Sequence, residues 1–209
     1  MESNTIGIVG AGKLGITLAQ LARKAGYEVY ISGSREPSKI ELSVQVLAPG
    51  AYAVTTSEVV RVSDIVILAI PLSKFRLLKP EDFTDKLVVD AMNYWWEVDG
   101  PRTDSVTEGM SSSEAVQLHL SQARIVKALN HMGYHDLHDE TRPTGTPERK
   151  AIAVAGDDPA DIDTVSRLID TLGFDALNIG VLSNGTRLEP GHPAFGANVT
   201  TLELARLTS

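Results

Sequence analysis

Thr5-Ile6-Gly7-Ile8-Val9-Gly10-Ala11-Gly12-Lys13-Leu14-Gly15 is the stretch of this sequence that decides the fold. A short run rich in β-branched residues leads into a GxGxxG pattern. Apolar residues then recur at helical spacing, and Gly26 follows as a residue that can end a helix. The repeating apolar residues are Leu14, Leu18, Leu21 and Ala25. The stretch therefore predicts a strand, a tight turn and a helix.

The three glycines of the pattern have different physical roles. Gly10 permits the sharp turn after the strand, Gly12 lets the backbone approach a pyrophosphate, and Gly15 lets the helix pack closely on the sheet. The free N–H groups at the start of the helix would then hold the phosphates. Because the pattern follows a predicted strand and precedes a predicted helix, it favours dinucleotide binding over a purely structural turn.

Composition and charge narrow the class of protein. The 209 residues suffice for one large domain or one and a half, and 43% hydrophobic with 22% charged residues is typical of a globular protein. A net charge of -8 opposes binding to nucleic acid or to an acidic membrane surface, and we expect neither partner.

The chain has no cysteine, which excludes disulfides, thiolate metal sites and cysteine nucleophiles. We therefore expect a cytoplasmic protein. The longest apolar run, Ile65 to Leu72, is much shorter than the roughly 18 residues of a membrane span, and no export signal is recognisable at Met1.

The loop after the second predicted strand, Glu28 to Ser32, indicates which dinucleotide is bound. NAD-binding proteins carry an Asp or Glu here that binds the ribose hydroxyl. This chain instead has Gly33 and Ser34, with the cations Arg35 and Lys39 close by. Charged hydrogen bonds are worth about 1.5–3 kcal/mol each, so we expect NADP. The alternative is a solvated basic loop without a ligand.

The remaining pattern predicts a doubly wound α/β fold with a mostly parallel sheet. Further strands are predicted at Tyr52 to Val54, Asp64 to Pro71, Leu87 to Asp90, Arg124 to Leu129, Ala151 to Ala155 and Phe174 to Ile179. Helices are predicted within residues 36–50, from Thr56 to Val62, Ser112 to Leu120, Pro159 to Leu172 and Val199 to Leu207. Asp136 to Lys150 is polar and predicts a loop or hinge.

We therefore divide the chain into a dinucleotide-binding domain, residues 1–150, and a C-terminal βαβ extension with a tail, residues 151–209. The extension is expected to continue the same sheet and to complete the substrate site. In the extension, Asp157-Asp158 resembles a pair of catalytic carboxylates. The proline that follows favours Asp158 as a helix N-cap instead.

Several motifs in this order together resemble the NADP oxidoreductases that use the deazaflavin coenzyme F420. They are GIVGAGKLG, Gly33-Ser34-Arg35 with Lys39, Ala69-Ile70-Pro71, Val88-Val89-Asp90-Ala91-Met92-Asn93-Tyr94-Trp95, Val126-Lys127-Ala128-Leu129-Asn130, Val154-Ala155-Gly156-Asp157-Asp158 and Leu182-Ser183-Asn184. The resemblance runs over nearly the whole chain. It implies a Rossmann domain with a small C-terminal addition, a homodimer, and reversible hydride transfer between NADPH and the deazaflavin.

The resemblance also implies which residues form the site. The NADP-binding set is Gly10, Ala11, Gly12, Lys13, Leu14, Gly15, Ser34, Arg35, Lys39, Ile70, Pro71, Leu72, Asn93 and Asn130. It places His131, Met132 and Tyr134 where the two rings would stack. From the residues themselves we add Tyr94 and Trp95, so the predicted substrate-binding set is Tyr94, Trp95, His131 and Met132, and we take His131 and Tyr134 as the candidate catalytic residues. The bulky Tyr94-Trp95-Trp96 and a His-rich loop depart from the family pattern, which leaves the hydride acceptor open.

Hydride transfer between stacked rings needs alignment more than side-chain chemistry. A flavin, an imine or a carbonyl are alternative acceptors. The last two would need a proton donor, for which His131 is the first candidate before Tyr94 and Tyr134. A domain that senses NADP without turnover is the alternative from another functional class.

Two further features have competing interpretations. His131, His135 and His138 with Asp139 have a spacing that could bind a metal ion, but histidines in a polar loop are more often surface residues, and we expect no metal. Tyr94-Trp95-Trp96 is equally compatible with a stacking platform and with a hydrophobic contact between domains or subunits.

Overall fold

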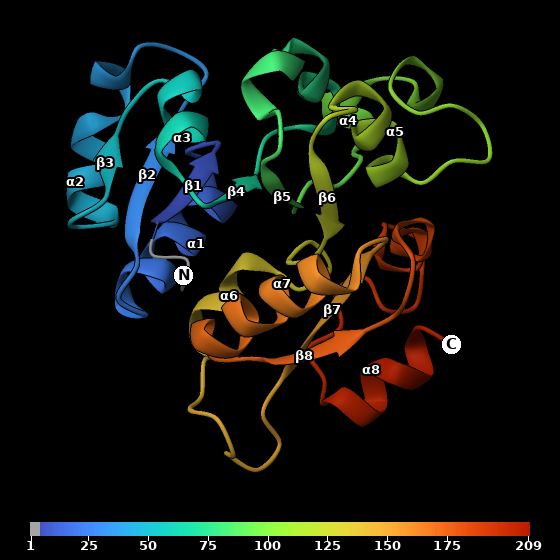
Figure 1. Cartoon of the computed structure of the whole chain (residues 1–209). Coiled ribbons are helices and arrows are strands. Elements are labelled where there is room, and N and C mark those ends of the chain that lie inside the picture. The colour runs from blue at the N-terminus through green and yellow to red at the C-terminus, as the bar shows by residue number, and fades with distance from the viewer. Residues whose placement is uncertain (1–4) are drawn as a thin grey trace.

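The computed structural model describes residues 5–209 as an eight-stranded sheet flanked by helices (Figure 1). The strands are β1 (Thr5–Val9), β2 (Glu28–Ser32), β3 (Tyr52–Ala53), β4 (Ile65–Leu68), β5 (Leu87–Asp90), β6 (Arg124–Lys127), β7 (Ala151–Gly156) and β8 (Asp175–Asn178). The helices are α1 (Lys13–Lys24), α2 (Glu41–Leu47), α3 (Thr56–Val62), α4 (Trp96–Asp99), α5 (Ser112–His119), α6 (Tyr134–Asp139), α7 (Pro159–Leu172) and α8 (Thr201–Leu207).

The strand order is β3-β2-β1-β4-β5-β6-β7-β8. The first six strands are all parallel, and their order reverses between β1 and β4, as in dinucleotide-binding folds. β7 joins β6 in the antiparallel direction, and β8 is parallel to β7. The predicted Rossmann-type, mostly parallel α/β fold is confirmed.

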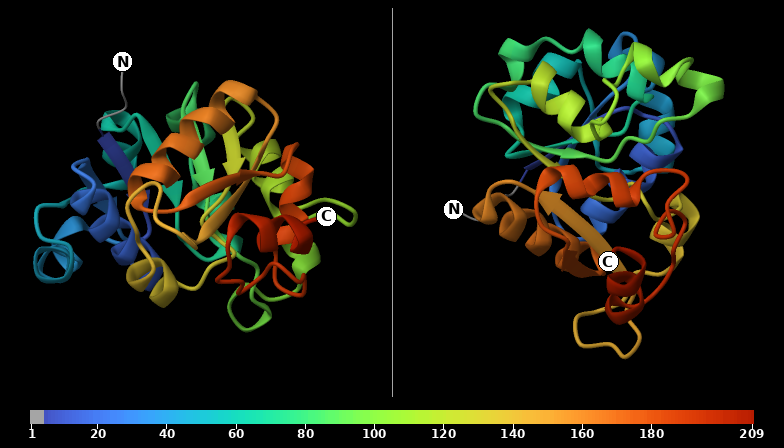
Figure 2. Two further views of the ribbon diagram at one scale, coloured as in Figure 1. Left: turned by 90° about the horizontal axis from the view of Figure 1, so that it is seen from below. Right: turned by 90° about the vertical axis from the view of Figure 1, so that its right-hand side faces the viewer.

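Helices cover both faces of the sheet because the central strands are apolar on both sides. In β4, Ile65 and Ile67 belong to the core cluster that contains α1, α6 and α7, whereas Val66 and Leu68 belong to the cluster that contains α3 and α5. This alternation is typical of a parallel strand buried on both faces. Among the helices of the first cluster, which also include α2, helix α1 packs against both α6 and α7 on one side of the sheet (Figures 1 and 2).

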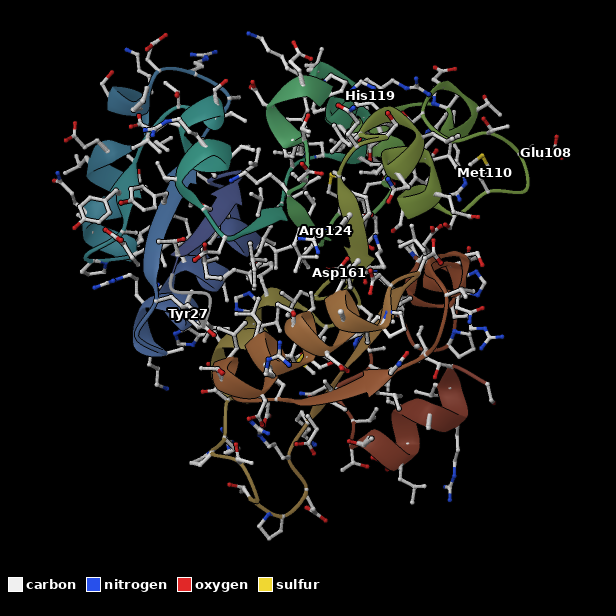
Figure 3. The ribbon with its side chains drawn as sticks, viewed as in Figure 1. Tyr27, Glu108, Met110, His119, Arg124 and Asp161 are labelled. Carbon is white, nitrogen blue, oxygen red and sulfur yellow. The ribbon has the colours of Figure 1, made fainter. Side chains whose placement is uncertain are left out.

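The C-terminal strands are tied to the six-stranded part by packing and by charge. Arg124 of β6 and Asp161 of α7 point toward one another and form an ion pair (Figure 3). Helix α8 covers the outer part of β7 and β8 in a small third cluster around Leu204. The proposed boundary at residue 150 remains a prediction, although β7 and β8 do extend the sheet.

The loop predicted over residues 136–150 is partly wrong, because its start belongs to α6. Leu137 is fully buried in the cluster that contains α1, and it is the one buried residue of that helix. A helix held by a single apolar side chain shows no apolar periodicity, so the sequence pattern could not reveal it. Within residues 5–209, no helix is long and apolar enough to cross a membrane.

The turn between β1 and α1 depends on two glycines that touch. Gly10 has a φ of +122°, a conformation that side chains disfavour. A Cβ atom on Gly15 would lie 1.8 Å from the carbonyl oxygen of Gly10, and one on Gly10 would lie 2.3 Å from that of Ala69. A Cβ on Gly12, in contrast, would meet no atom within 4 Å. Gly10 and Gly15 are therefore required by packing, and Gly12 is not.

We predict that Gly15→Ala lowers the free energy of unfolding while Gly12→Ala does not. Overpacking of this kind costs about 1–3 kcal/mol, which corresponds to a fall in Tm of about 2–12 °C for a chain of this size. Thermal unfolding of the two variants and the wild type measures the difference. Equal Tm values for Gly15→Ala and Gly12→Ala would contradict the close contact.

Candidate functional site

The predicted site residues gather at one edge of the sheet. Because β1, β4, β5 and β6 are parallel, the segments that follow them begin at the same edge. The order of the strands reverses between β1 and β4, and in open α/β sheets the crevice at such a point is where ligands bind. The loop after β2 reaches the same edge, since Gly10 donates a backbone hydrogen bond to Ser32 (2.8 Å).

The start of α1 is open to an anion. Its N-cap residue, Gly12, makes no side-chain cap, and the first turn contains no acidic residue. Gly12 and Lys13 are exposed, and the space beside the Gly12 Cα is free. Unpaired N–H groups at a helix start attract phosphates. The structure thus has room and donors for a pyrophosphate at this helix.

The loop after β2 presents two free cations and a hydroxyl. Ser34, Arg35 and Lys39 are all exposed, and their side chains make no hydrogen bond or ion pair with any residue of the described chain. A Cβ on Gly33 would lie 2.9 Å from the Ile40 side chain, so an acidic residue there would collide with it. The acidic group that would select NAD is absent, and donors for a phosphate stand in its neighbourhood.

The segments after β5 and β6 are joined by two asparagines. Asn93 Nδ2 donates to the backbone oxygen of Asn130 (2.7 Å), and Asn130 Nδ2 donates to Asn93 Oδ1 (2.9 Å) and to the backbone oxygen of Leu188 (2.8 Å). Asn130 Oδ1 is buried and has no partner within residues 5–209. The preceding residue, Leu129, has a φ of +64°, which is unfavourable for leucine. We call this arrangement the asparagine clamp.

The loop after β4 adds three residues of the NADP-binding set that the resemblance implies. Leu72 is buried, Ile70 is half-buried, and Pro71 is exposed. These residues follow the strand that pairs with β1, so they begin beside the glycine turn. Whether they contact a nucleotide stays a prediction.

His131 is buried and fixed rather than free. Its side chain accepts a hydrogen bond at Nε2 from the Ala153 backbone (3.1 Å), and only 1% of the residue is exposed. Burial lowers the pKa of the imidazole to about 4, against a smaller opposing effect of the Ala194 backbone. The other ring nitrogen, Nδ1, is buried and has no hydrogen-bond partner of ordinary geometry within residues 5–209. A neutral imidazole held in this way joins the segment after β6 to β7.

The other residues that follow β6 differ in exposure. Met132 is buried in the core, whereas Tyr134 is half-buried at the start of α6. The ammonium of Lys13 lies 5.4 Å from the centre of the Tyr134 ring. Tyr134 is thus a phenol beside the start of α1, with access to solvent that His131 lacks.

The aromatic segment after β5 is partly open. Tyr94 donates its hydroxyl to the backbone oxygen of Gly100 (2.7 Å), so that hydroxyl is already engaged. Trp95 packs edge-to-face on Phe195 with ring centres 5.6 Å apart, and Trp96 is 63% exposed. The C-terminal tail therefore meets the segment expected to bind the substrate.

The three histidines of the metal hypothesis do not converge. Nε2 of His131 points to Ala153, and Nδ1 of His138 lies 2.8 Å from Asp139 at the surface. No group of three or more His, Asp or Glu residues in the part of the chain that the structure describes could hold a metal ion.

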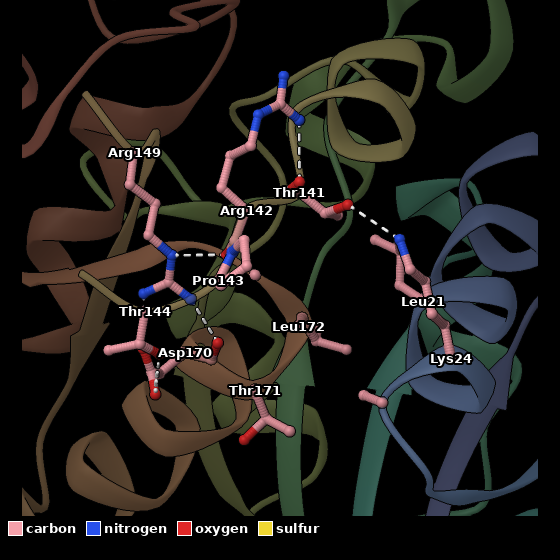
Figure 4. A pocket seen from close by; sticks show the side chains of 12 residues that line it. Leu21, Lys24, Thr141, Arg142, Pro143, Thr144, Arg149, Asp170, Thr171 and Leu172 are labelled. Atoms are coloured by element: carbon pink, nitrogen blue, oxygen red, sulfur yellow. Dashed lines mark hydrogen bonds and ion pairs between the residues drawn. The ribbon is translucent and has the colours of Figure 1, made fainter. Parts of the chain in front are cut away.

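A separate pocket of about 450 Å³ lies at the far end of α1 (Figure 4). Lys24 lines it, and the 12 residues of α1 place this residue about 18 Å from the glycine turn. Arg149 in the pocket is paired with Asp170 (2.6 Å) and Asp175 (2.9 Å). Polar side chains drawn in Figure 4 bind one another. We therefore regard this pocket as part of the packing of the fold and not as a ligand site.

The structure also contains a pair that the sequence analysis missed. Asp90 and Lys127 occupy paired positions at the ends of β5 and β6 and form an ion pair (3.2 Å) in which neither side chain is exposed. The sequence does contain a signal for this pair, because one charged residue ends each of two apolar strands, Asp90 in β5 and Lys127 in β6. Such residues are rare in a core unless they are paired.

We predict that His131 makes the fold less stable in acid. The unfolded chain protonates this histidine below its ordinary pKa of about 6.5, whereas the folded chain resists until about pH 4. Stability from this residue is thus complete above the unfolded pKa and is lost as the pH falls toward the folded one, by about 2 kcal/mol at about pH 5. Urea unfolding at about pH 7 and about pH 5 measures it.

The matched variant is His131→Gln, whose amide oxygen can accept the Ala153 N–H without titrating. We expect this variant to lose less stability than the wild type between the two pH values. An identical loss in both proteins would show that His131 does not cause the acid sensitivity.

Comparison with known proteins supports the resemblance found in the sequence. Residues 5–94 match the family described as NADP oxidoreductase coenzyme F420-dependent. This range contains the glycine turn, the loop after β2 and the segment after β4. A search of curated proteins found no match.

Solved structures share the fold over most of the chain. A hypothetical protein, SMa0349 from Sinorhizobium meliloti, is 26% identical with a TM-score of 0.82, over 94% of this chain and 95% of its own. A candidate F420-dependent NADP-reductase from Arthrobacter sp. FB24 is 23% identical with a TM-score of 0.72, over 88% and 87%.

An imine reductase from Pseudomonas sp. is 16% identical with a TM-score of 0.62, over 98% of this chain and 60% of its own length. At these identities the second and third structures show the fold alone. The resemblance to the F420-dependent NADP oxidoreductases is confirmed by the family match over residues 5–94.

Proposed function

We propose that this protein binds NADP(H) along the edge described above and transfers a hydride between it and the deazaflavin coenzyme F420. The observation that carries the proposal is the uncapped start of α1 at the same sheet edge as Arg35 and Lys39, whose side chains have no partner in the described part of the chain. These two features supply donors for two separate phosphate groups. The match to the F420-dependent family supports the same reaction.

The adenosine half of the nucleotide would lie between the glycine turn and the loop after β2. A ribose phosphate there can take a bidentate pair of hydrogen bonds from Arg35, a hydrogen bond from Ser34 and a point charge from Lys39. NAD lacks this phosphate and would leave the two cations unused. We therefore propose NADP rather than NAD.

The asparagine clamp suits the nicotinamide half. The unpartnered oxygen of Asn130 is an acceptor that a carboxamide N–H could satisfy, and an unsatisfied buried acceptor is costly. The reciprocal bonds to Asn93 hold that oxygen in one orientation. The chain can thus orient the ring by one buried acceptor while Ile70 and Leu72 exclude water from one side.

The acceptor would bind on the side formed by Tyr94 and Trp95, where an exposed aromatic surface can stack on a planar ring. Bound NADPH would supply a hydride, and the deazaflavin would take that hydride together with one proton from water. No side chain has to form a covalent bond in this reaction. Tyr134 has better access to solvent than the buried, neutral His131, so it is the stronger candidate for proton exchange.

We predict that Arg35→Ala weakens NADP binding and leaves NAD binding unchanged. Loss of charged hydrogen bonds worth about 1.5–3 kcal/mol corresponds to a fall of about 10- to 150-fold in NADP affinity. Titration calorimetry with both nucleotides measures it. Arg206→Ala, an exposed arginine on α8, is the matched control and should change neither affinity. An unchanged preference in Arg35→Ala would refute the assignment of the ribose phosphate.

We predict that the protein transfers a hydride from NADPH to oxidised F420 when it is mixed with both. The change in absorbance of the two cofactors measures the transfer. Gly12→Ala should fold normally and weaken NADPH binding by about tenfold or more, because its Cβ would stand where the pyrophosphate approaches. If the hydride goes to a free flavin or to a cyclic imine and not to F420, that molecule would take the place of F420 as the proposed acceptor. Binding without any transfer would favour an NADP sensor.

A further inference from the structure

We infer that Asp90 and Lys127 are positioning residues for the nicotinamide end of the site, an inference that rests on the proposed NADP binding. The two side chains bind the backbone of Met92, one at its N–H and the other at its C=O. The next residue, Asn93, is half of the asparagine clamp. The pair therefore sets where the acceptor oxygen of Asn130 stands.

The contacts around Met92 are direct. Lys127 Nζ donates to the Met92 backbone oxygen (2.6 Å), and the Met92 N–H donates to Asp90 Oδ1 (2.9 Å). Lys127 Nζ also donates to Asp90 Oδ2 (3.2 Å), which accepts a second bond from Ser113 Oγ (2.7 Å). The backbone N–H and the backbone C=O of Met92 are thus fixed by two side chains that are themselves bonded together.

The stem of Lys127 is fixed as well. A Cβ on Gly185 would lie 3.0 Å from Lys127 Cγ, so the segment Leu182–Leu188 packs directly on the lysine. The same segment accepts a hydrogen bond from Asn130 at the Leu188 oxygen. One stretch of chain therefore supports both the ion pair and the clamp.

Stability alone does not account for this pair. Two charges buried with no exposed surface lose their hydration, and well-packed apolar residues often serve a core equally well. Apolar side chains could not bond to the N–H and the C=O of Met92. The polar network determines the path of the segment after β5, and that segment carries Asn93 and Tyr94 toward the site.

The test compares NADP with its 2′-phosphorylated ADP-ribose fragment, which lacks the nicotinamide. Lys127→Met removes the bond to Met92, and the pair Asp90→Asn with Lys127→Met removes the charge that the single change leaves behind. We expect the affinity advantage of NADP over the fragment to fall by about tenfold in both, roughly one buried hydrogen bond. Fragment affinity should stay within about twofold of the wild type.

Arg124→Met is the matched control, because it removes another ion pair of β6 at the end away from the clamp. It should leave the NADP-to-fragment ratio unchanged. If both Lys127 variants fail to fold, Ser113→Ala is the replacement. It removes one hydroxyl from the network and should lower the ratio of NADP affinity to fragment affinity. Folded variants with a wild-type ratio would overturn the inference. A wild-type protein that binds neither ligand would instead overturn the proposed function, and this inference with it.

Discussion

The contact between Gly15 and the carbonyl oxygen of Gly10 is the constraint on which the rest of the site depends. It leaves no space for a side chain at Gly15, and it brings the start of α1 against the end of β1. The adjoining contact of Gly10 with Ala69 adds the end of β4 to the same point. The uncapped N–H groups of α1 consequently face the place where the strand order reverses.

Exposed charge is the main feature of one end of this sheet edge, and a buried ion pair is the main feature of the other end. The chain carries a net charge of -8, yet the loop after β2 presents Arg35 and Lys39, whose side chains have no partner among residues 5–209. Local donors therefore decide which anion is held at that end. At the other end, Asp90 and Lys127 are completely buried and act on the backbone. One half of the edge would recognise phosphates, and the other half would orient a ring.

The sequence revealed what depends on local rules and missed what depends on distant contacts. The β1 strand, the glycine turn and α1 follow from glycine geometry and helical spacing within a few residues, and the structure has them as predicted. The N-cap at Asp158 was equally clear from the sequence, because a proline follows it at the first helical position. α6 was missed because its one buried side chain, Leu137, packs against elements far away in the sequence.

The same limit applied to the site. The buried side chain of His131 is bonded to Ala153, which lies 22 residues further along the chain. No local sequence pattern indicates this contact. The asparagine clamp joins two loops 37 residues apart, and the ion pair beneath it depends on the pairing of β5 with β6. The resemblance predicted which loops would form the site. Only the fold shows which of their atoms are bonded, buried or free.

A crystal structure of the protein grown with NADP would show directly where the nucleotide binds. We expect the pyrophosphate on the first turn of α1, the ribose phosphate between Ser34, Arg35 and Lys39, and the carboxamide against Asn130 Oδ1. A nucleotide bound elsewhere, or one whose ribose phosphate points away from Arg35, would contradict this expectation.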